Sequence, residues 1–110
     1  MRLHSYKFRN EVSALVAKII EASQQDEHIS ALYLFGSHAR NEATILSDVD
    51  FAVVSQIPAK VNRGCLNYAA ESFDIPCDFV YTTDKAIAAS TSELDVNFQI
   101  KTKGVLLWQR

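Results

Sequence analysis

Hydrophobic residues recur along this chain with two different periods. From Arg9 to Ser23 they return every three or four positions, which predicts an amphipathic helix with one face toward a core. Three short apolar runs follow, at 31–35, 48–54 and 77–81, and each has the length and composition of a strand. The chain therefore alternates between helical and strand patterns.

The remaining segments continue this alternation. Pro58 begins a helical stretch that runs to about Phe73 and is weakened by Gly64. The run 92–95, Ser-Glu-Leu-Asp, predicts a helix start of the capping-box type, and Gly104 predicts the stop. Residues 105–108 then predict a short edge strand. The expected apolar face of the 58–73 helix comprises Val61, Leu66, Tyr68, Ala69 and Phe73.

This order of elements predicts an α/β (α+β) fold, with a mixed sheet of about four strands and helices mainly on one face. At 110 residues, a single domain spanning 1–110 is expected. The formal net charge is −2, and no basic stripe is visible, so direct nucleic-acid binding and a polymerase role are not indicated. The apolar stretch 15–20 is interrupted by Lys18 and is too short to cross a membrane, so a cytoplasmic protein is expected.

The two cysteines, Cys65 and Cys77, lack the spacing of a metal site. We expect both to be free thiols in a reducing compartment, and no zinc site is predicted.

The segment that follows the first strand carries the most chemical information. Gly36 permits a sharp turn and a close approach of backbone N–H groups to a ligand, and Ser37 can cap a short helix. The start of a helix attracts phosphate. Arg40 would share a helical face with Ser37, so a hydroxyl and a guanidinium would point at one anion.

Asp48 and Asp50 lie two apart at the start of the second strand and therefore project from the same face. Two neighbouring carboxylates repel unless cations lie between them, and a site made only of oxygen ligands favours Mg²⁺ or Mn²⁺. Asp78 stands among apolar residues in the third strand. If that strand pairs beside the second, three carboxylates converge.

One motif resembles the polymerase-beta-type nucleotidyltransferase superfamily. It consists of Gly36-Ser37, ten further residues, Asp48-x-Asp50 and, in a later strand, Asp78. The chain resembles the minimal members of this superfamily, the MNT-domain proteins, in the sequences of residues 34–40 and 47–50, in its small size and in the C-terminal sequence 104–108. These are commonly the antitoxins of HEPN–MNT toxin–antitoxin pairs. The chain departs from the pattern at Asn41, where many members have glycine, but Asn tolerates the left-handed backbone.

The resemblance implies a polymerase-beta-like fold and a two-metal reaction. Asp48, Asp50 and Asp78 would hold two Mg²⁺ ions (Mn²⁺ is an alternative), with ATP as substrate and pyrophosphate as leaving group. Asp78 would also help to deprotonate the attacking hydroxyl. Gly36 and Ser37 would bind the beta and gamma phosphates, with Arg40 as a further contact.

Other residues have simpler interpretations. Asp74 and Asp84 are explained by a turn and a helix start. Ser37 is no hydrolase nucleophile, because the G-x-S-x-G motif is absent. Arg40 can also be read as a surface charge. Surface positions are expected for the three histidines, His4, His28 and His38.

The carboxylates must lie in an open groove, and this chain has no residues left for a helical domain that would hold an acceptor. A partner must complete the site, and Tyr81, Leu107 and Trp108 could contact it or belong to the core. The first hypothesis is an antitoxin that transfers AMP from ATP to a hydroxyl group of a HEPN-family ribonuclease, with tyrosine as the first candidate acceptor. The two proteins would form a hetero-oligomer. The alternatives are an antitoxin that acts by binding alone and a nucleotidyltransferase that modifies a small hydroxylated molecule.

Overall fold

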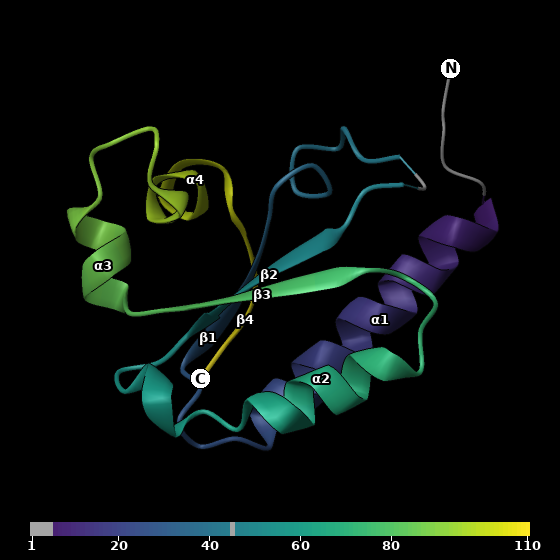
Figure 1. The fold of residues 1–110 in the computed structure, drawn as a ribbon, viewed down its shortest axis with the longest axis horizontal. Coiled ribbons are helices and arrows are strands. Elements are labelled where there is room, and N and C mark those ends of the chain that lie inside the picture. Colours follow the sequence, from purple (N-terminus) through teal and green to yellow (C-terminus); the bar gives the residue numbers. More distant parts are fainter. Residues whose placement is uncertain (1–5, 45) are drawn as a thin grey trace.

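Four strands form a mixed sheet in the order β3-β2-β1-β4 (Figure 1). The computed structural model describes residues 6–44 and 46–110, so His4 lies outside the described residues. The central strand β1 (Ala31–Phe35) runs antiparallel to β2 (Val49–Val54) and to β4 (Val105–Gln109). β2 runs parallel to β3 (Cys77–Thr82). The predicted mixed sheet of four strands, with 105–108 in an edge strand, is confirmed.

The main core lies between one face of the sheet and two helices, α1 (Tyr6–Gln24) and α2 (Arg63–Glu71) (Figure 1). α1 covers the predicted range Arg9 to Ser23, and its apolar stripe is buried at Leu15 and Ile19. These side chains belong to the same buried cluster as Leu32, Val49, Phe51, Val53 and Leu66. The helical period of α1 and the alternation of the strands thus meet in one core.

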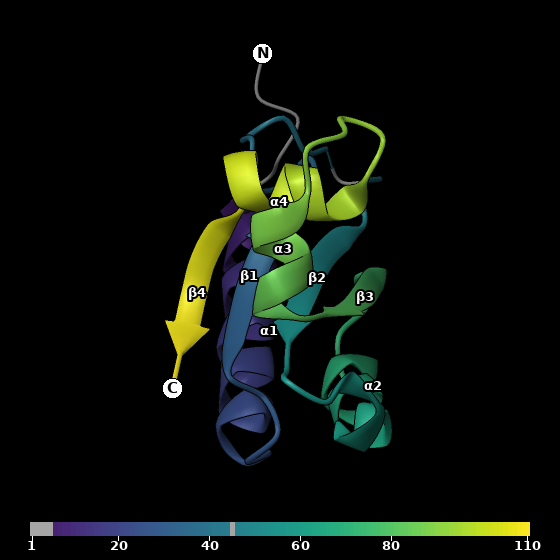
Figure 2. The ribbon, with the colours of Figure 1, turned by 90° about the vertical axis from the view of Figure 1, so that its left-hand side faces the viewer.

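A second, smaller cluster covers the opposite face, where Phe35 and Ala52 pack with Ile100 of α4 (Val96–Lys103). α3 (Asp84–Ala89) adds Ile87 to this cluster. The sequence indicated a helix start at Asp84 but not the extent of this helix, because a helix this short shows no clear period. Thr83 caps it by accepting a hydrogen bond from the Ala86 N–H at 3.0 Å. Helices were expected mainly on one face, but they cover both, with the larger core beneath α1 and α2 (Figure 2).

The helix predicted from Pro58 to Phe73 is divided in the structure. Pro58 starts a separate 3₁₀ turn, η1 (Pro58–Lys60). α2 begins at Arg63, because the Asn62 side chain caps it by accepting the Cys65 N–H at 3.2 Å. Tyr68 was expected on the apolar face, but it is 78% exposed. The other expected positions are buried or partly buried on the core: Val61, Leu66, Ala69 and Phe73.

α4 also begins later than its sequence pattern suggested. Its N-cap is Asp95, whose carboxylate accepts the Asn97 N–H at 3.0 Å. The Ser92 hydroxyl instead accepts the Leu94 N–H within a preceding turn. Gly104 ends the helix as predicted, with its N–H donating to the Ile100 carbonyl.

Both cysteines are free thiols, as predicted, with Cys65 exposed and Cys77 half-buried. The three apolar residues considered for a partner contact, Tyr81, Leu107 and Trp108, pack partly buried against the main core. None of the described helices is long and apolar enough to span a membrane.

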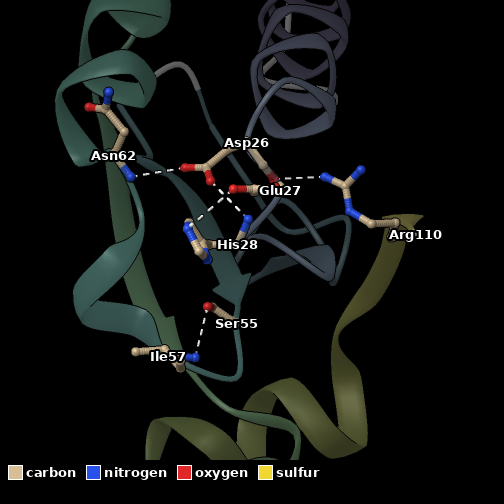
Figure 3. A network of polar contacts seen from close by, with 7 residues as sticks. All are labelled: Asp26, Glu27, His28, Ser55, Ile57, Asn62 and Arg110. Atoms are coloured by element: carbon tan, nitrogen blue, oxygen red, sulfur yellow. Dashed lines mark hydrogen bonds and ion pairs between the residues drawn. The ribbon is translucent and has the colours of Figure 1, made fainter.

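A network of polar contacts lies at the end of the sheet where β1 begins (Figure 3). The Asp26 carboxylate accepts the Asn62 N–H at 2.9 Å and the His28 N–H at 3.0 Å. Arg110 donates to the Asp26 carbonyl at 2.7 Å and to the Ile29 carbonyl at 3.0 Å. This network joins the end of α1, the start of α2 and the end of β4. His28 is half-buried in it rather than freely exposed.

Candidate active site

The turn after β1 is built around Gly36, whose φ of +74° is in the left-handed region. A side chain at this position would also collide with Asp50: a Cβ atom would lie 3.2 Å from Cγ of that carboxylate and closer still to Oδ2. Glycine is therefore required both for the backbone conformation and for the position of Asp50. The sequence predicted the turn but gave no sign of this contact.

The short helix expected after Gly36 is a single turn in the structure. The Arg40 N–H donates to the Gly36 carbonyl at 3.2 Å, and the Glu42 N–H donates to the Ser37 carbonyl at 2.9 Å. Asn41 closes the turn with φ +59°. This backbone pattern is the usual glycine-type end of a helix, so Asn41 adopts the left-handed conformation that its sequence position suggested.

Asp50 and Asp78 occupy matching positions on the parallel strands β2 and β3. They project from the face that carries Ala52 and Val80, and Asp48 lies one residue before β2. Asp50 is half-buried, whereas Asp48 and Asp78 are exposed. The structure thus brings the three predicted carboxylates together at one end of the sheet, beside the Gly36 turn.

Nearby carboxylates contribute to the raised pKa values of Asp50 and Asp78. Burial raises the pKa of Asp50, and the charges of Asp78 and Asp48 raise it further, while Arg40 lowers it. The pKa of Asp78 is raised by local desolvation, then by its hydrogen bond with Asp48 and by the Asp48 charge. Repulsion of this kind is what a bound cation relieves.

Arg40 and His38 complete the surroundings of the carboxylates. Arg40 lies close enough to Asp50 to lower its pKa, and its Nε lies 3.4 Å from Oε2 of Glu42. His38, expected at the surface, is half-buried and its Nε2 lies 3.4 Å from the Ser47 carbonyl oxygen. This contact joins the two ends of the 38–47 loop. A sequence gives no signal for it, because nothing in the pattern pairs these positions.

The residues present fit hard divalent cations by their chemistry, since all three side chains supply carboxylate oxygens. Gly36 leaves the space that the Asp50 carboxylate occupies. In the described ranges 6–44 and 46–110, however, no three acidic, histidine or cysteine side chains already converge as a complete metal site. The carboxylates of Asp48 and Asp78 are both exposed, so solvent ions have access to them.

Neither of the two aspartates set aside in the sequence contributes to the raised pKa values of Asp50 and Asp78. Asp74 is exposed in the bend that follows α2, and Asp84 is the first residue of α3. The cap of that helix is Thr83 rather than Asp84 itself.

Comparisons with known proteins agree with this fold. Residues 17–110 match the family described as polymerase beta, nucleotidyltransferase. This chain therefore belongs to the polymerase-beta nucleotidyltransferase family. No curated protein matches it.

Several solved structures share the fold. A candidate nucleotidyltransferase from Sulfolobus solfataricus is 20% identical, with a TM-score of 0.59 and coverage of 97% of this chain and 90% of that one. A toxin–antitoxin structure with AMP-PNP is 24% identical, with a TM-score of 0.63 and coverage of 86% and 73%. A complex of tri-AMPylated Shewanella oneidensis HEPN toxin with MNT antitoxin is also 24% identical, with a TM-score of 0.57 and coverage of 89% and 72%.

Proposed function

We propose that this chain is an antitoxin that transfers AMP from ATP to a hydroxyl group of a HEPN-family ribonuclease and so inactivates it. Tyrosine is the first candidate for the acceptor residue. The observation that carries the proposal is the position of Asp48, Asp50 and Asp78 beside the Gly36 turn on a nucleotidyltransferase fold. The similar structures support it, because they include a toxin–antitoxin with AMP-PNP and a tri-AMPylated HEPN toxin with its MNT antitoxin.

Asp48, Asp50 and Asp78 would hold two Mg²⁺ ions, or Mn²⁺ in their place, which would supply charge neutralisation around the triphosphate. The Asp50 carboxylate lies in the space that a side chain at position 36 would occupy. Its exposed neighbours can adjust to the ions and to the substrate. Desolvation, followed by the neighbouring carboxylates, raises the pKa values of Asp50 and Asp78, and a bound cation would favour their charged forms.

In the proposed reaction the backbone N–H groups of Gly36 and Ser37 bind the beta and gamma phosphates. Arg40 adds a positive charge on the same side. Asp78 is exposed at the start of β3, where it can accept the proton of the attacking hydroxyl. A bond forms between the acceptor oxygen and the alpha phosphorus, and the bond from that phosphorus to pyrophosphate breaks.

The exposure of Asp48 and Asp78 also bears on the acceptor. A folded partner could approach these carboxylates directly and insert a hydroxyl. An added AMP group brings negative charge to the partner, which would oppose RNA binding when the group lies near its active site.

Intact-mass spectrometry of the protein encoded by the adjacent gene, after incubation with this chain, ATP and Mg²⁺, tests the proposal. We expect a gain of one or more AMP units with the natural chain and at least a 100-fold slower gain with Asp48→Asn, because a metal ligand is lost. Asp74→Asn is the matched control, since that exposed carboxylate lies outside the group, and it should act as the natural chain does.

The other outcomes identify the alternatives. A stable complex without any mass change would replace the proposal with neutralisation by binding alone. If neither complex nor mass change occurs, the proposal is wrong, and turnover of small hydroxylated acceptors would be assayed with the same nucleotide and metal.

A further inference from the structure

Among the three carboxylates proposed to bind metal, Asp48 is the one that lies outside the sheet. Asp50 pairs with Phe35 of β1 and with Asp78 of β3, so strand pairing fixes the backbone of both aspartates. β2 begins only at Val49, one residue after Asp48. The Asp48 carboxyl nevertheless lies within hydrogen-bond reach of Asp78. The position of Asp48 therefore depends on contacts outside the strand ladder.

Hydrogen bonds hold the peptide groups on both sides of Asp48. On its C-terminal side, the Val49 N–H donates to the Pro76 carbonyl at 2.9 Å. On its N-terminal side, Nε2 of His38 lies 3.4 Å from the Ser47 carbonyl oxygen. That oxygen belongs to the same planar peptide group as the Asp48 N–H, so a hydrogen bond to one fixes the orientation of the other. His38 therefore restrains the backbone from which the Asp48 side chain projects.

The chemistry of the contact makes the His38 ring the donor. A carbonyl oxygen only accepts hydrogen bonds, so Nε2 must carry the hydrogen atom. The ring is half-buried, which reduces competition from water. At 3.4 Å the contact is longer than the usual range of about 2.7–3.2 Å, so its effect should be that of one modest hydrogen bond.

His38 belongs to the turn that would bind the phosphates. It follows Gly36 and Ser37 directly, and its carbonyl accepts the Asn41 N–H at 3.3 Å, where Asn41 closes the turn. The backbone of this turn is thus held by its own hydrogen bonds, while the His38 side chain reaches the residue before Asp48. One side chain therefore connects the proposed phosphate-binding turn with a proposed metal ligand.

We propose that His38 is a positioning residue for metal binding: its ring holds the Ser47 peptide group and so keeps Asp48 beside Asp50 and Asp78. This proposal rests on the proposed function and adds how the phosphate-binding turn is coupled to the metal ligands. In this role His38 itself contacts neither the ions nor the nucleotide.

The Kd of Mn²⁺ tests this role without any AMP transfer. It would be measured by electron paramagnetic resonance in the presence of α,β-methylene ATP, which cannot release AMP. His38→Ala should raise the Kd roughly threefold to tenfold, the loss expected for one hydrogen bond. His38→Gln should restore most of the affinity, because glutamine carries a donor nitrogen as many bonds from the backbone as Nε2 of histidine. His38→Asn, whose amide ends one bond earlier, should not.

The matched control is His28→Ala. His28 is also half-buried, but it lies in the network of Figure 3, at the end of the sheet where β1 begins. This variant should leave the Kd unchanged, and thermal melts should confirm that all the variants fold. Equal Kd values for the natural chain and His38→Ala would overturn the proposal, and so would equal losses in His38→Ala and His38→Gln.

A double substitution separates action through Asp48 from a general effect on the loop. His38→Ala should raise the Kd in the natural chain but not in Asp48→Asn, titrated to higher Mn²⁺, because that ligand is already lost there. An equal further loss in the Asp48→Asn background would mean that His38 supports the loop as a whole, and it would overturn the positioning role.

AMP transfer to the protein encoded by the adjacent gene gives an independent readout. Transfer by His38→Ala should be slow at low Mn²⁺ and recover as the ion concentration rises, whereas a deficit that persists at saturating Mn²⁺ would contradict a role in metal binding. Absence of transfer by the natural chain, with the expected order of Kd values, would overturn the proposed transfer but leave the positioning role standing. Normal transfer with unchanged Mn²⁺ affinity in His38→Ala would do the reverse.

Discussion

The two ends of the β1–β2 pair are built in opposite ways. At the end where β1 begins, Asp26 and Arg110 join three chain segments through hydrogen bonds of 2.7–3.0 Å (Figure 3). At the end where β2 begins, Asp48, Asp50 and Asp78 lie close together. Desolvation first, and the neighbouring carboxylates after it, raise the pKa values of Asp50 and Asp78. One end satisfies its polar groups within the chain, and the other carries neighbouring negative charges that the proposed cations would neutralise.

Under the proposed function, this difference separates the residues that stabilise the sheet from those that act in catalysis. Substitutions at the networked end should lower stability with little effect on catalysis, because they remove hydrogen bonds. Substitutions at the carboxylate end should abolish catalysis and can even raise stability, since they remove repulsion.

The largest effect is expected for Gly36→Ala. The left-handed backbone and the collision with the Asp50 carboxylate should together destabilise the fold by about 3 kcal/mol and displace the carboxylate from its position. AMP transfer, measured by mass spectrometry, should fall at least as far as with Asp48→Asn. Gly64→Ala is the matched control, because a Cβ there meets only Asn62 Oδ1 at an ordinary 3.4 Å, and it should stabilise α2 by about 0.5–1 kcal/mol.

Arg110→Ala tests the networked end. Loss of the side-chain hydrogen bonds to the Ile29 and Asp26 carbonyls should lower the free energy of unfolding by about 1–2 kcal/mol, measured by urea denaturation. AMP transfer below the melting temperature should stay within about twofold of the natural rate. Arg110→Lys keeps the charge but not the forked geometry and should recover only part of the stability. A large loss of activity in Arg110→Ala at full folding would contradict the separation of the two ends.

A smaller gain in stability is expected for Asp50→Asn without metal ions. Because folding raises the pKa of Asp50 above 3.8, the folded protein holds its proton more tightly than the unfolded chain does. The free energy of unfolding contributed by this group therefore falls as the pH rises from 3.8 through the folded-state pKa. Above that range Asp50→Asn should melt a few degrees higher than the natural protein, and at pH 3 the difference should shrink.

Metal ions provide a further test of the carboxylate end. Adding Mn²⁺ or Mg²⁺ at pH 7.5 should raise the melting temperature of the natural protein, since bound ions stabilise the folded state, and should not raise that of Asp50→Asn. An equal rise in both proteins would mean that the ions bind elsewhere.

The smallest perturbation is a chemical one. Burial raises the pKa of Cys77 to about 11, with further contributions from the Asp78 and Asp48 charges, while Cys65 is exposed. At pH 8 and without metal ions, iodoacetamide should modify Cys65 first, and peptide mapping would identify the site. Faster modification of Cys77 would contradict the burial and negative charge assigned to the carboxylate end.

Local patterns in the sequence determined much of this molecule. The helical period of α1, the boundaries of β1 and the left-handed backbone of Asn41 depend on neighbouring residues, and each could be predicted from them. Strand alternation predicted Asp48 and Asp50 on one face, whereas Asp78 was expected to join them only if its strand paired beside the second, as the family resemblance implied. The parallel pairing of β2 with β3 meets that condition. The family match confirms the fold predicted from these elements and from the resemblance they carry.

Tertiary structure decided what depends on residues far apart in the chain. Only the fold places Gly36 against Asp50 and Arg110 against the end of α1, because strand pairing and helix packing bring these positions together. Competition between hydrogen-bond partners also shifted helix starts, as when the Ser92 hydroxyl accepts an N–H within a turn and leaves Asp95 to cap α4. The sequence determined which chemical groups the protein carries, and packing determined which of them meet.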